Sequence, residues 1–132
     1  MQASATWVTE DRFVGVASSG HAVVTDASET KLGSSPLELV LIGLCGCTAS
    51  DVTTILRKKR ESFSFLEVHA HAERAPEPPM VFTAIRLLYR ISSSVSHKAM
   101  EDAVRLSREK YCSVSQMLAK TAKITDEIEY VD

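Results

Sequence analysis

The chain has 132 residues, of which 45% are hydrophobic and 24% are charged, and its formal net charge is −2. This length fits one domain, residues 1–132, and the composition is typical of a folded protein rather than a disordered chain. The charge argues against a nucleic-acid partner, because phosphate binding requires a basic surplus on one face. The N-terminus lacks the pattern of a secretory signal, and the apolar run 37–46 is shorter than the ~20 residues of a membrane span. We therefore expect a cytoplasmic protein that binds neither nucleic acid nor membrane.

Short β-rich runs occupy the N-terminal third of the chain. They cover residues 3–8, 13–16 and 21–25, and polar, turn-like segments separate them. Runs of this kind are typical of strands joined by tight turns. We expect a small antiparallel meander here, followed by a polar loop over residues 26–35.

A long helix is predicted from Pro36 to about Arg60. Ser35 is its expected N-cap, and Pro36 suits the first helical position because its missing N–H would be unpaired there in any case. Glu38, three residues after Ser35, completes a capping box in which each side chain bonds the other residue's backbone N–H. The first half of this helix is apolar on every side, which indicates burial all round.

Two glycines lie in the apolar half of this helix. Gly43 and Gly46 each lower helix propensity by ~1 kcal/mol relative to Ala. Their presence is best explained by another backbone that packs closely against the helix. Because so short a chain can hardly cover an all-apolar helix, we expect an obligate dimer that buries it between subunits.

The rest of the chain alternates strands and helices. It is predicted to form strands over residues 65–73, 81–91 and 124–131, and helices over residues 96–110 and from Ser113 onward. The strand 65–73 should have one half-buried face and one wet face, since polar residues alternate along it. This order of elements is that of an α+β fold.

Helical spacing makes two further predictions in the C-terminal half. Ser113 is expected to be the N-cap of the last helix, with Gln116 closing a second capping box. The preceding helix should bury one stripe of side chains. That stripe consists of Met100, Ala103, Val104, Ser107 and Tyr111.

The three cysteines have different surroundings. Cys112 precedes a helix N-terminus, whose partial positive charge lowers a thiol's pKa. Cys47 lies three turns into its helix with Asp51 on the same face, and a carboxylate there raises a thiol's pKa unless a cation intervenes. Cys45 points ~200° around the helix from Cys47 and is expected to be core filler. The residues alone leave open which thiol is reactive, if either is.

No other pattern predicts a site. His69 and His71 share one strand face, a chelating geometry, yet that face looks like solvated surface. The chain has no nucleotide-binding loop, no nucleophile elbow and no zinc-like ligand spacing. We therefore expect no metal site and no cofactor.

Two segments resemble the cysteine motifs of the OsmC/Ohr family. They are residues 35–49 (SPLELVLIGLCGCTA) and residues 111–115 (YCSVS). The resemblance extends over nearly the whole chain and is closest to the OsmC-like branch. It implies an OsmC-like fold with antiparallel sheets packed around a long central helix, in an intertwined homodimer with sites at the subunit interface.

The resemblance also implies thiol-dependent reduction of organic hydroperoxides or hydrogen peroxide. In that family, the cysteine that matches Cys47 attacks the peroxide and becomes a sulfenic acid. The cysteine that matches Cys112 then condenses with it to a disulfide, which an external thiol or dithiol reduces. This sequence agrees with the general oxidation chemistry of a thiolate beside a resolving cysteine.

The family's supporting residues match less well. Well-characterised members carry a Glu directly after the helix-opening Pro, where it helps to hold an Arg near the attacking thiolate. Leu37 occupies that position here, and Glu38 follows it. Arg12 is the sole Arg before the helix. Arg12 and Glu38 are therefore the candidates for supporting roles. The alternatives are a non-catalytic dimeric binding protein for a hydrophobic ligand and a thiol redox sensor.

Overall fold

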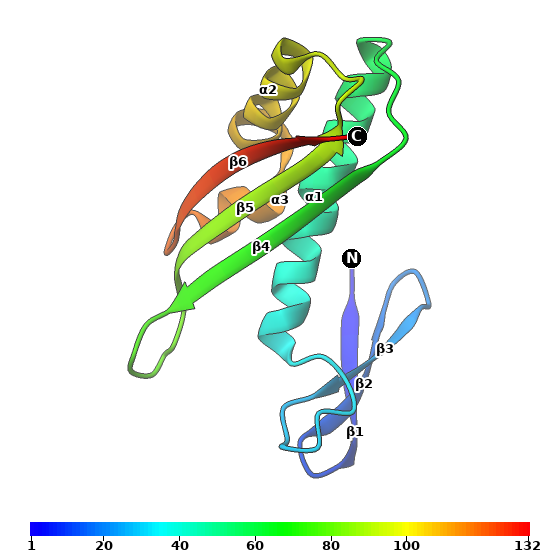
Figure 1. Cartoon of the computed structure of the whole chain (residues 1–132). Coiled ribbons are helices and arrows are strands. Elements are labelled where there is room, and N and C mark those ends of the chain that lie inside the picture. Colours follow the sequence, from blue (N-terminus) through cyan, green and yellow to red (C-terminus); the bar gives the residue numbers. More distant parts are fainter. The chain divides into compact units, whose positions relative to one another are not determined.

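The computed structural model describes all 132 residues and divides them into two compact units, Met1–Ile42 and Gly43–Asp132 (Figure 1). Two three-stranded sheets and a long helix make up an α+β fold, as predicted. The prediction of one domain over residues 1–132 stays a prediction. The elements in chain order are β1 (Ala3–Thr9), β2 (Arg12–Ala17), β3 (Ala22–Asp26), α1 (Pro36–Lys58), β4 (Leu66–Arg74), β5 (Phe82–Ser92), α2 (His97–Leu106), η1 (Ser107–Tyr111), α3 (Ser113–Leu118) and β6 (Lys123–Val131).

The first unit contains the predicted meander. β2 lies between β1 and β3 and is antiparallel to both. The loop after β3 is organised by the Asp26 carboxylate, which is 2% exposed. It accepts hydrogen bonds from Arg12 Nε (3.2 Å), Thr30 Oγ1 (3.1 Å), the Leu32 amide (3.0 Å), and both the amide (2.8 Å) and hydroxyl of Ser28. A single buried carboxylate thus ties the loop to the sheet.

The start of α1 confirms the predicted capping box. The Ser35 amide donates to Glu38 Oε1 at 2.8 Å, and the Glu38 amide donates to Ser35 Oγ at 3.2 Å. These bonds from Ser35 lower the pKa of the Glu38 carboxyl. The helix ends at Lys58, two residues before the predicted end.

The second unit places its helices on one face of the sheet β4–β5–β6 (Figure 1). β4 and β5 are antiparallel, whereas β6 runs parallel to β5, so the second sheet is mixed rather than wholly antiparallel. Alternation along β5 directs large apolar side chains toward the helices. The core of the second unit consists mainly of side chains that are at most 1% exposed: Leu44, Val52, Leu56, Ile85, Leu87, Tyr89, Ile91, Met100 and Ala103.

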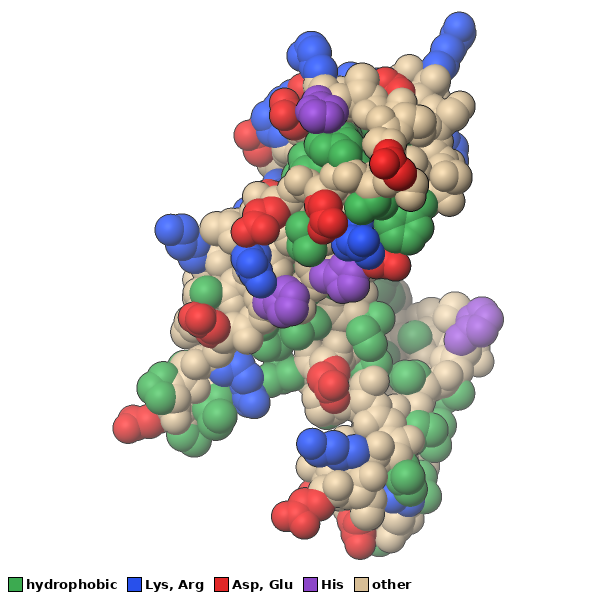
Figure 2. Space-filling model, viewed as in Figure 1, with side chains coloured by type: hydrophobic (Ala, Val, Ile, Leu, Met, Phe, Trp, Pro, Cys, Tyr) green, Lys and Arg blue, Asp and Glu red, His purple; other side chains and the backbone are tan.

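The opposite face of this sheet is polar. Figure 2 shows acidic, basic and histidine side chains interspersed over it. Ion pairs cross the strands, including Arg90 with Glu67 at 3.1 Å and Arg90 with Glu129 at 3.4 Å. His69 and His71 are exposed on this side, which confirms the predicted wet face of β4.

The apolar half of α1 is not buried all round within one chain, and the sequence prediction places the rest of its burial between two subunits. Val40 is 36% exposed and Ile42 is 58% exposed. Nothing in the second unit lies within 4 Å of where a Cβ at Gly43 or Gly46 would stand, so no backbone of that unit packs against these glycines. By length and composition alone, α1 meets the requirement for a membrane span, as core helices of soluble proteins also do. Its later turns contribute Val52 and Leu56 to the core.

A π-helical turn, η1, follows α2 and changes the helix register. The Cys112 amide donates to the carbonyl oxygen of Ser107 at 2.7 Å, a bond that spans five residues. The predicted buried stripe holds as far as Ser107, which is 0% exposed, but Tyr111 is 50% exposed. The prediction for Tyr111 was wrong because the wider turn rotates it away from the position that regular α-helical spacing gives it.

Candidate thiol site

The site is built from two helices of the second unit. α1 supplies Cys47 and Asp51, which lie on one face because they are four residues apart. Cys112 stands between η1 and α3. The Sγ atoms of Cys47 and Cys112 and a carboxylate oxygen of Asp51 all lie within 4.8 Å of one another. All three cysteines are free thiols in this structure.

Cys112 is the more enclosed of the two thiols. It is 0% exposed, whereas Cys47 is half-buried. Burial raises the pKa of the Cys112 thiol, and the neighbouring Cys47 adds to this, although hydrogen bonds from Ser115 act in the opposite direction. The expectation that a helix N-terminus lowers the pKa of Cys112 was therefore wrong, because the cost of desolvating a thiolate outweighs it.

Cys112 is itself the N-cap of α3. Its Sγ accepts the Ser115 amide at 3.3 Å, and its backbone is extended with φ −76° and ψ 102°. The prediction of Ser113 as the cap was one residue late. Gln116, expected to close that capping box, donates instead to the Arg108 carbonyl at 2.8 Å.

Ser107 holds the carboxylate of the site in place. Its hydroxyl donates to Asp51 Oδ2 at 2.9 Å, and the Ser107 side chain is fully buried. This is the one protein hydrogen bond to the Asp51 carboxylate, so one oxygen remains without a protein donor. Sequence reasoning found Asp51 from its spacing to Cys47 but did not find its partner, which lies 56 residues away.

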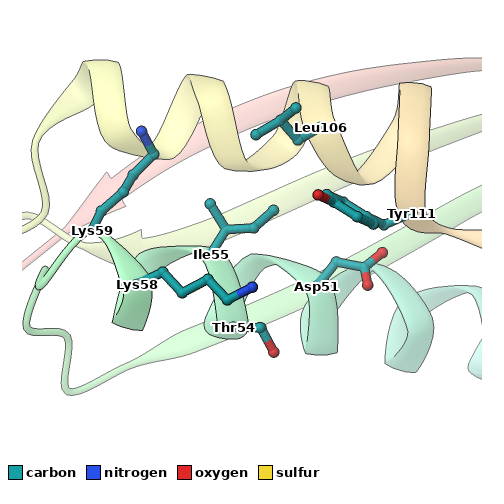
Figure 3. Close-up of a pocket in the computed structure, with 7 residues that line it drawn as sticks. All are labelled: Asp51, Thr54, Ile55, Lys58, Lys59, Leu106 and Tyr111. Carbon is teal, nitrogen blue, oxygen red and sulfur yellow. The ribbon is translucent and has the colours of Figure 1, made fainter.

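A cavity of about 400 Å³ opens beside Asp51 between α1 and the α2–η1 segment (Figure 3). Its walls are mostly apolar, with Ile55 on one side and Leu106 and Tyr111 on the other, while Lys58 at the end of α1 and Lys59 just after it stand farther from Asp51. Asp51 links the two features, since it belongs both to the thiol cluster and to the cavity wall.

The other predicted residues have partners of their own. In the first unit, Arg12 is bound to Asp26, and its Nη2 donates to Thr30 Oγ1 at 3.2 Å. Glu38 is engaged in the capping box at the start of α1. Cys45 is half-buried, and burial raises its pKa. The structure brings together Cys47 and Cys112 of the predicted set, keeps Asp51 beside Cys47 as its spacing indicated, and adds Ser107.

A family model described as OsmC-like protein matches residues 28–127 of this sequence. The chain belongs to the OsmC-like family. This OsmC-like chain is 40% identical to Protein YhfA of Escherichia coli strain K12, with 99% of this chain and 98% of that protein covered.

Solved structures of other proteins share the OsmC-like fold. An OsmC-like protein from Mycoplasma pneumoniae is 18% identical, with a TM-score of 0.87 over 99% of this chain and 96% of that one. The organic hydroperoxide resistance protein OhrB of Bacillus subtilis is 12% identical, with a TM-score of 0.70 over 98% of both chains. At these identities the likeness establishes the fold, which confirms the OsmC/Ohr resemblance found in the sequence.

Proposed function

We propose that this OsmC-like protein is a thiol peroxidase that reduces organic hydroperoxides or hydrogen peroxide with Cys47 and Cys112. The observation that carries the proposal is the approach of the two sulfurs to within 4.8 Å, although 65 residues separate them. A disulfide has an S–S length of about 2.05 Å, so its formation requires the sulfurs to move together by at most about 2.8 Å. Membership of the OsmC-like family and the shared fold of an organic hydroperoxide resistance protein support it.

Burial distinguishes the roles of the two thiols. Cys47 is half-buried and therefore accessible to a peroxide, while Cys112 is fully enclosed and burial raises its pKa, which disfavours its thiolate. The attacking group in thiol chemistry is the thiolate. We assign attack to Cys47 and resolution to Cys112.

The proposed cycle oxidises Cys47, pairs it with Cys112 and then regenerates both thiols. The Cys47 thiolate attacks the outer oxygen of R–O–O–H, the O–O bond breaks, and R–O⁻ takes a proton and leaves as an alcohol, or as water when the substrate is hydrogen peroxide. Cys47 is then a sulfenic acid. The Cys112 sulfur displaces the hydroxyl as water and forms the disulfide. An external thiol or dithiol reduces that disulfide by thiol–disulfide exchange. No cofactor is needed.

The cavity beside Asp51 suits the organic part of such a substrate. Ile55, Leu106 and Tyr111 offer apolar contact, and the cavity begins at the carboxylate that also faces the two thiols. Arg12 and Glu38 remain the proposed supporting residues on the strength of the family resemblance, with Arg12 as the proposed cation for the Cys47 thiolate.

We also propose that the working form is a cytoplasmic homodimer. Apolar side chains on α1, notably Val40 and Ile42, are exposed in one chain, and Gly43 and Gly46 have open space around them. Exposed contiguous apolar surface of this kind marks an interface in a soluble protein. A second copy of α1 would cover it, and the glycines would permit a close approach of the two backbones.

The test is hydroperoxide consumption with excess dithiol, measured with cumene hydroperoxide and with hydrogen peroxide. The native chain is expected to turn over, Cys47→Ser to be inactive, and Cys112→Ser to react once and become over-oxidised to a sulfinic acid. Cys45→Ser is the matched control and should retain native turnover. Arg12→Ala is expected to lower the rate without abolishing it.

Two results would contradict the peroxidase. Absence of turnover together with absence of a Cys47–Cys112 disulfide after peroxide treatment would favour a binding protein, which the apolar cavity would then serve. Disulfide formation without turnover under excess dithiol would instead indicate a redox sensor. Mass spectrometry of the intact and digested chain distinguishes these outcomes.

A further inference from the structure

The thiol site has the composition of a metal site as well as that of a redox pair. Two sulfurs and one carboxylate oxygen converge within 4.8 Å. In tetrahedral zinc coordination, Zn–S distances of ~2.3 Å and Zn–O distances of ~2.1 Å place the donor atoms roughly 3.6–3.8 Å apart. The three donors therefore reach this geometry with movements of at most about 1 Å each, which side-chain rotation provides.

The framework around these donors favours a defined geometry. Cys47 and Asp51 have the i, i+4 spacing at which one helix face presents two ligands to a single zinc ion. Cys112 is held by the bond from its amide to the Ser107 carbonyl at 2.7 Å. The Ser107 hydroxyl binds Asp51 Oδ2 at 2.9 Å, which orients the carboxylate and leaves its other oxygen for a metal. A hydrogen bond to a ligating carboxylate is the usual outer-shell feature of metal sites.

We propose that the reduced chain binds one thiophilic divalent cation, Zn²⁺, through Cys47 Sγ, Cys112 Sγ and one oxygen of Asp51. The two thiols release their protons to solvent on binding, as sulfur ligands must. The two thiolates and the carboxylate carry three negative charges, which Zn²⁺ reduces to one. Three protein ligands leave a fourth coordination position for water.

Metal binding and oxidation then exclude one another. A Cys47–Cys112 disulfide occupies both sulfurs and removes two of the three ligands, so oxidation releases the ion. A bound ion in turn occupies the sulfur that would attack a peroxide. The metal site itself requires only the reduced cluster and is independent of peroxidase turnover, so each proposal can fail without the other.

The test begins with the native chain reduced by a phosphine and freed of metal. Zn²⁺ is titrated in competition with a chromophoric chelator, and Co²⁺ is added in a parallel experiment as a spectroscopic probe. We expect one ion per chain, and with Co²⁺ the near-ultraviolet sulfur-to-cobalt charge-transfer band and the visible bands of a tetrahedral site.

The variants identify the ligands. Cys47→Ser, Cys112→Ser and Asp51→Asn are each expected to weaken Zn²⁺ binding by ~100-fold or more, and Ser107→Ala by about 10- to 100-fold through the outer shell. Cys45→Ser is the matched control and should bind as the native chain does. Circular dichroism confirms that each variant is folded, and native chain oxidised with diamide, which needs no substitution, should lose the ion.

Three results would overturn the proposal. The first is a reduced native chain that shows no Zn²⁺ binding when the free Zn²⁺ concentration is in the micromolar range or lower. The second is binding that survives in Cys47→Ser and Cys112→Ser but is lost in His71→Ala, which would place the ion on the wet face of β4. The third is a loss in Cys45→Ser equal to that in Cys47→Ser.

Discussion

Asp26 and Asp51 are two carboxylates, one in each unit, with opposite surroundings: Asp26 is buried, whereas Asp51 is half-buried. Asp26 accepts five hydrogen bonds, and the bond from the Ser28 hydroxyl contributes most to holding its pKa well below the usual range. Asp51 accepts one, from Ser107, and otherwise faces two sulfurs. A carboxylate saturated with donors serves the fold, whereas one with an unused oxygen remains available for chemistry.

The same substitution at both positions tests this contrast and should give the largest difference. Asp26→Asn places an amide where five donors require an acceptor and leaves Arg12 without its partner, so we expect a pronounced loss of stability in the first unit. Asp51→Asn is expected to change the unfolding free energy by no more than ~1 kcal/mol, because one hydroxyl bond is affected. Urea unfolding followed by far-ultraviolet circular dichroism measures the loss in both variants, and the fluorescence of Trp7, the sole tryptophan, reports on the first unit. Equal losses of unfolding free energy in Asp26→Asn and Asp51→Asn would contradict the difference in role that we assign to the two carboxylates.

Acid should also lower the stability of the native chain through Asp26, but more gradually than the substitution Asp26→Asn does. Because its folded pKa is depressed, the stability that it contributes is present above its unfolded pKa of ~3.9 and is lost as the pH falls toward the folded value. The unfolding free energy of the native chain should therefore fall from about pH 5 downward more steeply than that of Asp26→Asn. The two titration curves are compared by urea unfolding at fixed pH values. Parallel curves would show that Asp26 has no depressed pKa.

Removal of the single donor to Asp51 should have an intermediate effect. Ser107→Ala leaves a half-buried carboxylate without its hydrogen bond, and we expect a cost of ~1–2 kcal/mol in unfolding free energy. Chemical denaturation measured by far-ultraviolet circular dichroism gives this value. Ser115→Ala is a useful comparison, because Ser115 is also buried but its hydroxyl bonds the Cys112 carbonyl rather than Asp51. An unchanged unfolding free energy in Ser107→Ala would mean that water replaces the serine hydroxyl.

The smallest effect is expected at Tyr89, a buried polar group with no partner. Its side chain is 0% exposed, its hydroxyl makes no hydrogen bond of good geometry, and burial raises the pKa of the phenol, while the nearby Thr48 hydroxyl acts in the opposite direction. Tyr89→Phe removes a hydroxyl that was desolvated without compensation, so the unfolding free energy should stay the same or rise by up to ~1 kcal/mol. Thermal and urea unfolding measure the change. A clear loss of stability would show that this hydroxyl is bonded in solution.

Local patterns predicted the elements of this fold well. The capping box of Ser35 and Glu38 depends on residues three apart, and the structure contains both of its bonds. The meander, the long helix and the wet face of β4 follow from equally short-range periodicities. The direction of β6 was missed, because strand pairing across the sheet is set by topology and not by the alternation of its own residues.

The site was only partly predictable for the same reason. The i+4 spacing placed Asp51 beside Cys47, and the family resemblance paired Cys47 with Cys112. Nothing in the sequence indicated Ser107, which reaches Asp51 from another helix. Nor could spacing show that Cys112 is fully enclosed, since the burial that raises its pKa comes from tertiary packing.

The π-helical turn η1 has a consequence for which changes of length the chain tolerates. Its extra residue sets the rotation between the buried stripe of α2 and the Cys112 sulfur. Removal of one residue from Ser107–Tyr111 would restore an ordinary α-helix and improve local hydrogen bonding. It would also rotate everything after it by ~100° about the helix axis and swing Cys112 out of phase with Cys47. The Cys47 and Cys112 sulfurs therefore lie close together because the π-helical turn before Cys112 contains one residue more than a regular α-helical turn.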